Sequence, residues 1–172
     1  MALAVHHFPV AGSARPPVVL IHGFAASARA DYLATGWPEA LNAAGRSAIA
    51  VDLPSHGESP EVASAAEAST SAVVAAILGA VASVAPEGEF DLIGYSLGGR
   101  LGWELPGASP RVRRAVLGGV SPFDPFAVID APALEAVLGG GEPQHPVVGA
   151  IAGLIGASGR DDEGRPRVDA LV

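Results

Sequence analysis

The chain has 172 residues, a formal net charge of −8, and a composition that is 49% hydrophobic and only 16% charged. This length suits one ordinary domain, and so much apolar sequence excludes a disordered protein. The basic residues are all arginines and form no patch, so the acidic balance argues against a nucleic-acid partner. The absence of cysteine excludes disulfides and thiolate metal sites, and the scattered histidines show no metal-binding spacing.

No targeting or membrane segment is visible in the sequence. The start, MALAVHHFPV, lacks the basic stretch and continuous apolar run of a secretion signal. The most apolar helical stretch, residues 72–85, contains Gly79 and Ser83 and is shorter than the ~20 residues that a bilayer span needs. We therefore expect a cytoplasmic protein with no membrane span.

Strands and helices alternate along the first 120 residues. Short β-branched runs predict strands, and alanine-rich stretches that end at glycine or proline predict helices. The expected strands are residues 2–10, 17–21, 47–52, 90–93 and 114–120. The expected helices are residues 28–44, interrupted at Trp37-Pro38, 65–85 and 97–105. Since such alternation produces right-handed crossovers, it predicts an α/β fold with a mostly parallel, doubly wound sheet.

The stretch DLIGYSLGGR carries the strongest chemical signal. It reads as a strand, a sharp turn and a helix, with Ser96 at the turn between Gly94 and Gly98. Glycines at these positions remove the Cβ atoms that would collide where strand and helix approach closely. The turn predicts a nucleophilic serine at the carboxyl edge of the sheet, with the Leu97 N–H at the positive end of the helix.

A second backbone donor is expected from VVLIHGF. This strand ends in a His-Gly turn, which can aim the N–H of Phe24 at the spot that the Leu97 N–H faces. Two preorganised donors make an oxyanion hole, and losing one costs about 3–4 kcal/mol of transition-state stabilisation.

Together, the segments LIHGF, VDLPSHGES and LIGYSLGG, in this order and spacing, resemble the α/β-hydrolase superfamily. The resemblance covers about residues 17–120. It implies that Ser96 is the nucleophile, that Phe24 and Leu97 supply the oxyanion-hole N–H groups, and that no cofactor is needed. It also implies an ester, thioester or related small-molecule acyl substrate.

The resemblance also divides the chain. Residues 1–121 correspond to the α/β-hydrolase core, and residues 122–172 look like the start of the helical cap that covers the active site. Helical patterns at 132–138 and 147–155, with no further buried strand, support this division. Apolar residues of this segment favour a small apolar or aromatic acyl group.

A catalytic serine needs a base, and the chain offers few candidates. His22 and His56 lie in turns that they are expected to fix by hydrogen bonds, and His6 is expected at the surface or on an edge. That leaves His145, in GEPQHPVV, as the candidate base. Asp124 is the candidate acid because it follows the 114–120 strand closely.

The later strands with their usual acid and Gly-His turns are missing. The chain therefore resembles the first two-thirds of an α/β-hydrolase, and we expect an incomplete sheet from either a fragment without the catalytic histidine or a shortened relative. The strand at 114–120 would then be an exposed apolar edge.

Two alternatives stay open. One is a non-catalytic scaffold of the same fold that binds a ligand or partner, which the missing base favours. The other is a lyase that makes a menaquinone precursor, since GYSLGGR is similar to that branch and places Arg100 one helical turn beyond the serine, where it could bind substrate. The oligomeric state is left open.

Overall fold

A computed structural model describes residues 1–120 and 131–138 and the single residues 142, 146 and 149. The chain forms two units, Met1–Val120 and Ser121–Val172. The second contains one described helix, α4 (Ala131–Leu138), where the sequence predicts a helix at 132–138. The fold and the site below belong to the first unit.

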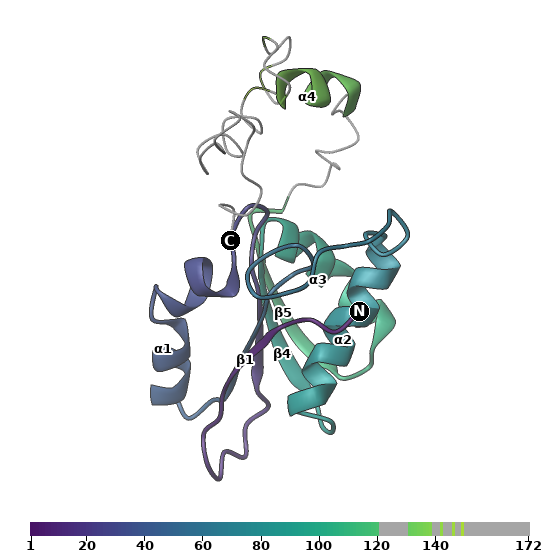
Figure 1. Cartoon of the computed structure of the whole chain (residues 1–172). Helices are drawn as coiled ribbons and strands as arrows, with labels where there is room; N and C mark the ends of the chain where they lie inside the picture. Colours follow the sequence, from purple (N-terminus) through teal and green to yellow (C-terminus); the bar gives the residue numbers. More distant parts are fainter. Residues whose placement is uncertain (121–130, 139–141, 143–145, 147–148, 150–172) are drawn as a thin grey trace. The chain divides into compact units, whose positions relative to one another are not determined.

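The first unit is built on a five-stranded sheet (Figure 1). Its strands are β1 (Val5–Phe8), β2 (Val18–Ile21), β3 (Ala48–Val51), β4 (Phe90–Tyr95) and β5 (Val112–Gly118). The spatial order is β1-β3-β2-β4-β5, with β1 antiparallel to β3 and every other pair parallel. The predicted α/β fold with a mostly parallel sheet is therefore confirmed.

Helices lie against both faces of the sheet, as Figure 1 shows for α1 and α2. They are the π-helix η1 (Arg29–Leu33) and the α-helices α1 (Trp37–Ala43), α2 (Thr70–Val84) and α3 (Leu97–Ala108). Alternate residues of β2 point to opposite faces of the sheet. Val19 and Ile21 pack into the hydrophobic core with residues of α2 and α3. Val18 and Leu20 pack into the core on the other face, which contains Tyr32. Burial on both faces explains why β2 is apolar throughout.

Several predicted boundaries are wrong for local reasons. The helix expected at 28–44, with an interruption at Trp37-Pro38, is two helices, and the break falls at Gly36, whose φ is 81°, just before the expected position. The helix expected from residue 65 begins at Thr70, where the Ser69 hydroxyl accepts a hydrogen bond from the Ala72 N–H. The helix expected to stop at 105 continues past Pro106, and the Ser109 N–H closes its end on the Leu105 carbonyl at 2.9 Å.

β5 is the last strand in the order of the described sheet, and most of its residues are exposed. Val116, near its middle, is 64% exposed. The apolar edge expected at residues 114–120 is thus present in the part of the chain that the structure describes. Among the described helices, none is long and apolar enough to cross a membrane.

Candidate functional site

Ser96 sits at the turn between β4 and α3 in a strained backbone conformation. Its φ is 51° and its ψ is −113°, a combination that a residue with a Cβ atom rarely adopts. Such strain costs of the order of 1–3 kcal/mol and persists only where the surroundings impose it. Here the Ser96 N–H donates to the Gly118 carbonyl at 2.8 Å, and the Ser96 carbonyl accepts from the Arg100 N–H at 2.9 Å.

The two glycines that flank the serine are required by close backbone contacts. A Cβ atom on Gly94 would collide with the backbone of Gly98, and one on Gly98 would collide with the carbonyls of Ile21 and His22. The start of α3 is therefore pressed against both β4 and the end of β2. This packing brings the serine turn next to the His-Gly turn that follows β2.

The Ser96 hydroxyl makes no hydrogen bond within the part of the chain that the structure describes, and the residue is half-buried. Leu97 is the first residue of α3, so its N–H belongs to the group of helix-start donors that have no partner within the helix. These donors, together with the positive end of the helix dipole, favour negative charge beside Ser96.

The His-Gly turn faces the serine from the end of β2. A Cβ atom placed on Gly23 would lie 3.4 Å from the Ser96 Cβ and 3.6 Å from Asp31 Oδ2. The Gly23 N–H donates to Asp31 Oδ2 at 2.9 Å. Asp31 in η1 therefore holds the turn from which Phe24 extends.

His22 is fully buried beneath this turn, and both of its ring nitrogens are engaged. Its Nε2 accepts from the Leu53 N–H at 2.9 Å, so its Nδ1 carries the proton and donates to the Gly23 carbonyl at 2.7 Å. Burial lowers the pKa of the ring and keeps it neutral. His22 thus joins the His-Gly turn to the loop after β3 and has no nitrogen left to act as a base.

Asp52, at the end of β3, fixes the same loops from the other side. Its carboxylate accepts hydrogen bonds from the N–H groups of Ala28 and Glu58 and from His6 Nε2 at 2.9 Å. Burial alone would raise the pKa of Asp52, but the bonds from His6, Ala28 and Glu58 together lower it. His6 lies on β1, an edge strand of the described sheet, as one of the two expected placements has it, but its side chain is only 17% exposed and is bonded to this carboxylate.

His56 lies beside the His-Gly turn that follows β2. Its ring centroid is 5.2 Å from that of His22 and 6.0 Å from that of Phe24. Its Nδ1 pairs with the Pro54 carbonyl at 2.7 Å, which fixes the proton on Nδ1 because a carbonyl only accepts. Nε2 has no hydrogen-bond partner among the described residues. Every buried polar side-chain atom of these residues has a partner, so Nε2 is not buried and is accessible to solvent.

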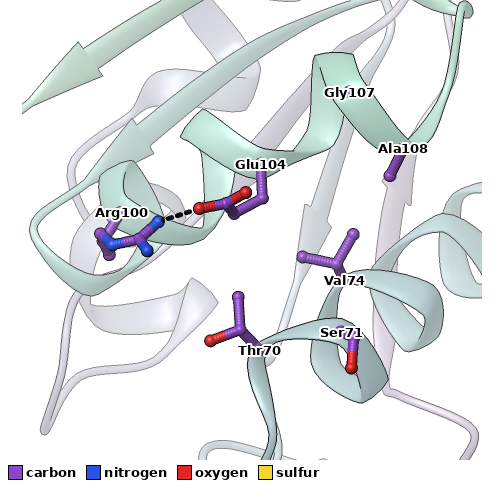
Figure 2. A pocket seen from close by; sticks show the side chains of 7 residues that line it. All are labelled: Thr70, Ser71, Val74, Arg100, Glu104, Gly107 and Ala108. Atoms are coloured by element: carbon purple, nitrogen blue, oxygen red, sulfur yellow. Dashed lines mark hydrogen bonds and ion pairs between the residues drawn. The ribbon is translucent and has the colours of Figure 1, made fainter.

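Arg100 points into an open groove between α2 and α3 (Figure 2). Its guanidinium pairs with Glu104 Oε1 at 2.6 Å, and the two side chains are 49% and 42% exposed. The groove has a volume of about 700 Å³ and is also lined by Thr70, Ser71 and Val74. The glutamate offsets the positive charge that a substrate carboxylate would need, so a substrate-binding role for Arg100 stays a prediction.

The sequence also named Asp124 and His145 as acid and base, and both lie outside the described residues. Asp31 is a site residue that the sequence analysis missed. It lies inside a helical stretch eight residues beyond Gly23, where neither spacing nor a motif marks it. Only the path of η1 back across the end of β2 brings its carboxylate to the Gly23 N–H.

Comparison with known proteins places this geometry in a family. A family model described as the alpha/beta hydrolase family matches residues 18–170. No curated protein is a significant sequence match to the chain.

Three similar solved structures carry different activities in their descriptions. The chain is similar to the bottromycin epimerase BotH in complex with bottromycin A2 (22% identity, TM-score 0.67, 98% of this chain and 65% of that one). It is also similar to a marine microorganism esterase (16% identity, TM-score 0.57, 99% of this chain and 70% of that one). A third is the N-acyl homoserine lactonase AidH complexed with N-butanoyl homoserine (19% identity, TM-score 0.60, 99% of this chain and 64% of that one). At these identities the likeness shows the fold, and the chain spans about two-thirds of the length of each structure.

Proposed function

Because the chain belongs to the alpha/beta hydrolase family, we propose that it is a serine hydrolase that cleaves an ester, thioester or related acyl substrate through Ser96. The observation that carries the proposal is the strained Ser96 at the start of α3, directly opposite the His-Gly turn. Strain of this kind presents a serine hydroxyl above the sheet edge, and a serine with a purely structural role has no need of it.

In this mechanism the Ser96 Oγ attacks the substrate carbonyl carbon as its proton passes to a base. The carbonyl oxygen becomes an oxyanion, which the N–H groups of Leu97 and Phe24 stabilise. Collapse of the tetrahedral intermediate breaks the bond to the alkoxide or thiolate leaving group, which takes the proton from the base. Water, activated by the same base, then attacks the acyl-enzyme and releases the carboxylic acid.

The base and acid of this scheme are carried forward from the sequence. His145 is the base that we propose, and Asp124 is the acid that would orient it. Among the described histidines, His22 has both nitrogens bonded and His6 pairs with Asp52. Replacing His145 with alanine should lower turnover by at least about a hundredfold if it takes the Ser96 proton.

Hydrolysis of p-nitrophenyl acetate tests the proposal. Ser96→Ala should lower kcat/KM by at least about a thousandfold, because it removes the atom that forms the acyl-enzyme. Ser83→Ala, on the exposed side of α2, is the matched control and should leave turnover unchanged. Equal rates for the Ser96→Ala variant and the unmodified chain would refute the proposal.

A non-catalytic scaffold is the second candidate, favoured by the Ser96 hydroxyl that makes no hydrogen bond within the described residues. Its expected result is no ester turnover in any variant, together with binding of a small acyl compound. The lyase alternative is weaker, since Glu104 offsets the Arg100 charge that would bind a carboxylate-rich substrate.

A further inference from the structure

A small cavity lies between the loop after β3, the first turns of α2 and the start of α3. Its volume is about 220 Å³. The side chains around it are mainly apolar and include Leu53, Pro54, Val62, Val73, Leu97 and Leu101. It is distinct from the open groove of Figure 2, although Thr70 borders both.

The walls of this cavity include the surroundings of both proposed oxyanion donors. Leu97 lines it and directly follows Ser96 in the chain. His56 lines it too, and the His56 ring contacts that of Phe24 at a centroid distance of 6.0 Å. An acyl group whose carbonyl oxygen meets these two N–H groups would therefore have the cavity beside it.

The chemistry of the lining selects a neutral, apolar occupant. Among the described residues, none that borders the cavity is an aspartate, glutamate or arginine. Two of its polar side chains are already engaged, because Ser55 Oγ accepts from the Val62 N–H and His56 Nδ1 pairs with the Pro54 carbonyl. A carboxylate placed here would exchange its hydration for, at most, the hydroxyl groups of Ser55 and Thr70, with no cation among the described lining residues to balance its charge, which is unfavourable.

From its position, size and lining, we propose that this cavity binds the acyl side chain of the substrate, and that it is sized for a phenyl ring on a short linker. A cavity of about 150 Å³ lined by apolar side chains accepts benzene, so about 220 Å³ accommodates the ring and one or two further carbons. This inference rests on the proposed hydrolase function, and it deepens that function by naming the acyl class as arylalkanoyl.

Filling the cavity tests this assignment. Ala68 lines it from an exposed loop position, so Ala68→Phe should occupy the space without disturbing the buried core. Ala66→Phe adds the same ring two residues away, at an exposed position that does not line the cavity, and is the matched control. Val62→Phe is a second filling variant from a different part of the same loop, for use if Ala68→Phe does not fold.

Binding of phenylacetone to the full chain, followed by calorimetry, is the deciding measurement. It needs no turnover, because this neutral ketone carries the phenyl group and carbonyl of the proposed acyl group but no leaving group. We expect a filling variant to weaken its affinity by about tenfold or more, and Ala66→Phe to leave it unchanged. Absence of binding to the unmodified chain, or equal affinity in the filled and control variants, would overturn the proposal.

Turnover separates this proposal from the function on which it rests. A filling variant should lower the ratio of kcat/KM for p-nitrophenyl phenylacetate over p-nitrophenyl acetate by about tenfold. If filling the cavity abolishes phenylacetone binding but neither ester is turned over in a Ser96-dependent way, the acyl-binding role of the cavity is supported and the hydrolase function is contradicted. If turnover depends on Ser96 but filling leaves the ratio of kcat/KM for the two esters unchanged, the hydrolase function is supported and the acyl-binding role of the cavity is contradicted.

Discussion

Ser96 combines backbone strain with a hydroxyl that has no hydrogen-bond partner among the described residues, two features that stability alone would select against. Its φ of 51° and ψ of −113° suit glycine, which has no Cβ atom to collide with the backbone. The hydrogen bonds to the Gly118 carbonyl and from the Arg100 N–H hold the conformation, so a side chain at this position costs stability.

Ser96→Gly should therefore make the protein more stable while abolishing turnover. We expect the free energy of unfolding to rise by about 1 kcal/mol, since glycine adopts this conformation without strain and the greater freedom of its unfolded chain offsets only part of the gain. Urea denaturation measures the change. Ser96→Ala, which keeps the Cβ atom, is the control and should show little stabilisation. A Ser96→Gly variant that is less stable than Ser96→Ala would contradict the claim that the Cβ atom strains the backbone here.

We propose that Asp31 is a positioning residue rather than a catalytic one, because its carboxylate bonds the Gly23 N–H. Asp31→Ala should lower kcat for p-nitrophenyl acetate by about tenfold with little change in KM, since the loop that presents the Phe24 N–H loses a hydrogen bond of about 1–2 kcal/mol. Asp31→Asn keeps an oxygen acceptor and should recover most of the rate. A variant that loses only stability, with kcat unchanged, would show that Asp31 has a purely structural role.

At the level of elements, one buried carboxylate joins three parts of the sheet. Asp91 in β4 accepts two hydrogen bonds from Arg113 of β5, at 2.8 and 2.6 Å, and pairs with Arg46, which precedes β3, at 2.7 Å. The bonds from Arg113 and then those from Arg46 outweigh burial and lower the pKa of Asp91 to about 2. The ion pairs thus stabilise the folded state only while Asp91 is ionised.

This pKa sets the pH at which the sheet weakens. A carboxyl group whose pKa is lowered by folding contributes its full stability above the unfolded pKa, near 4, and loses it as the pH falls towards 2. Between pH 5 and 2 the unmodified chain should lose about 1–2 kcal/mol more than Asp91→Asn, because partly exposed arginines limit the gain. Urea unfolding across this range, with Glu61→Gln as an exposed control, checks it; parallel curves for the chain and Asp91→Asn would contradict it.

The order of the elements could be predicted from the sequence because the central strands β2 and β3 are continuous apolar runs and because α1 and α2 are followed closely by Gly45 and Pro86. The serine turn could be predicted because its glycines are forced by contacts between neighbouring segments. An interruption at Trp37-Pro38 could be predicted too, but its exact place at Gly36 could not, since a glycine inside a helical pattern is often tolerated. The hydrogen bonds of Asp31 with Gly23 and of His6 with Asp52 could not be predicted either. Gly23 follows β2 and Asp52 follows β3, and only the packed sheet brings them to their partners.

For the molecule as a whole, the exposed edge at β5 has the largest consequence. Within the described sheet β5 pairs only with β4, and Val116 is 64% exposed on it. Unpaired N–H and C=O groups beside exposed apolar side chains form a template for pairing with another chain.

We therefore expect self-association that grows with concentration and is suppressed by Val116→Lys, since a charge on an edge strand opposes pairing with a second edge. Ala11→Lys adds the same charge at an exposed turn and is the control. Light scattering against concentration distinguishes them. Association that is equal in both variants would show that β5 is not the contact.

The central claim is that Ser96 is an activated nucleophile, and labelling with a fluorophosphonate tests it most directly. Intact-mass measurement should show one adduct per chain, peptide mapping should place it on Ser96, and Ser96→Ala should abolish it. The phosphonate needs the serine, its oxyanion donors and a functioning base, but no knowledge of the substrate. A chain that stays unlabelled under conditions that modify a known serine hydrolase, or that is labelled elsewhere, would contradict the claim and favour the scaffold.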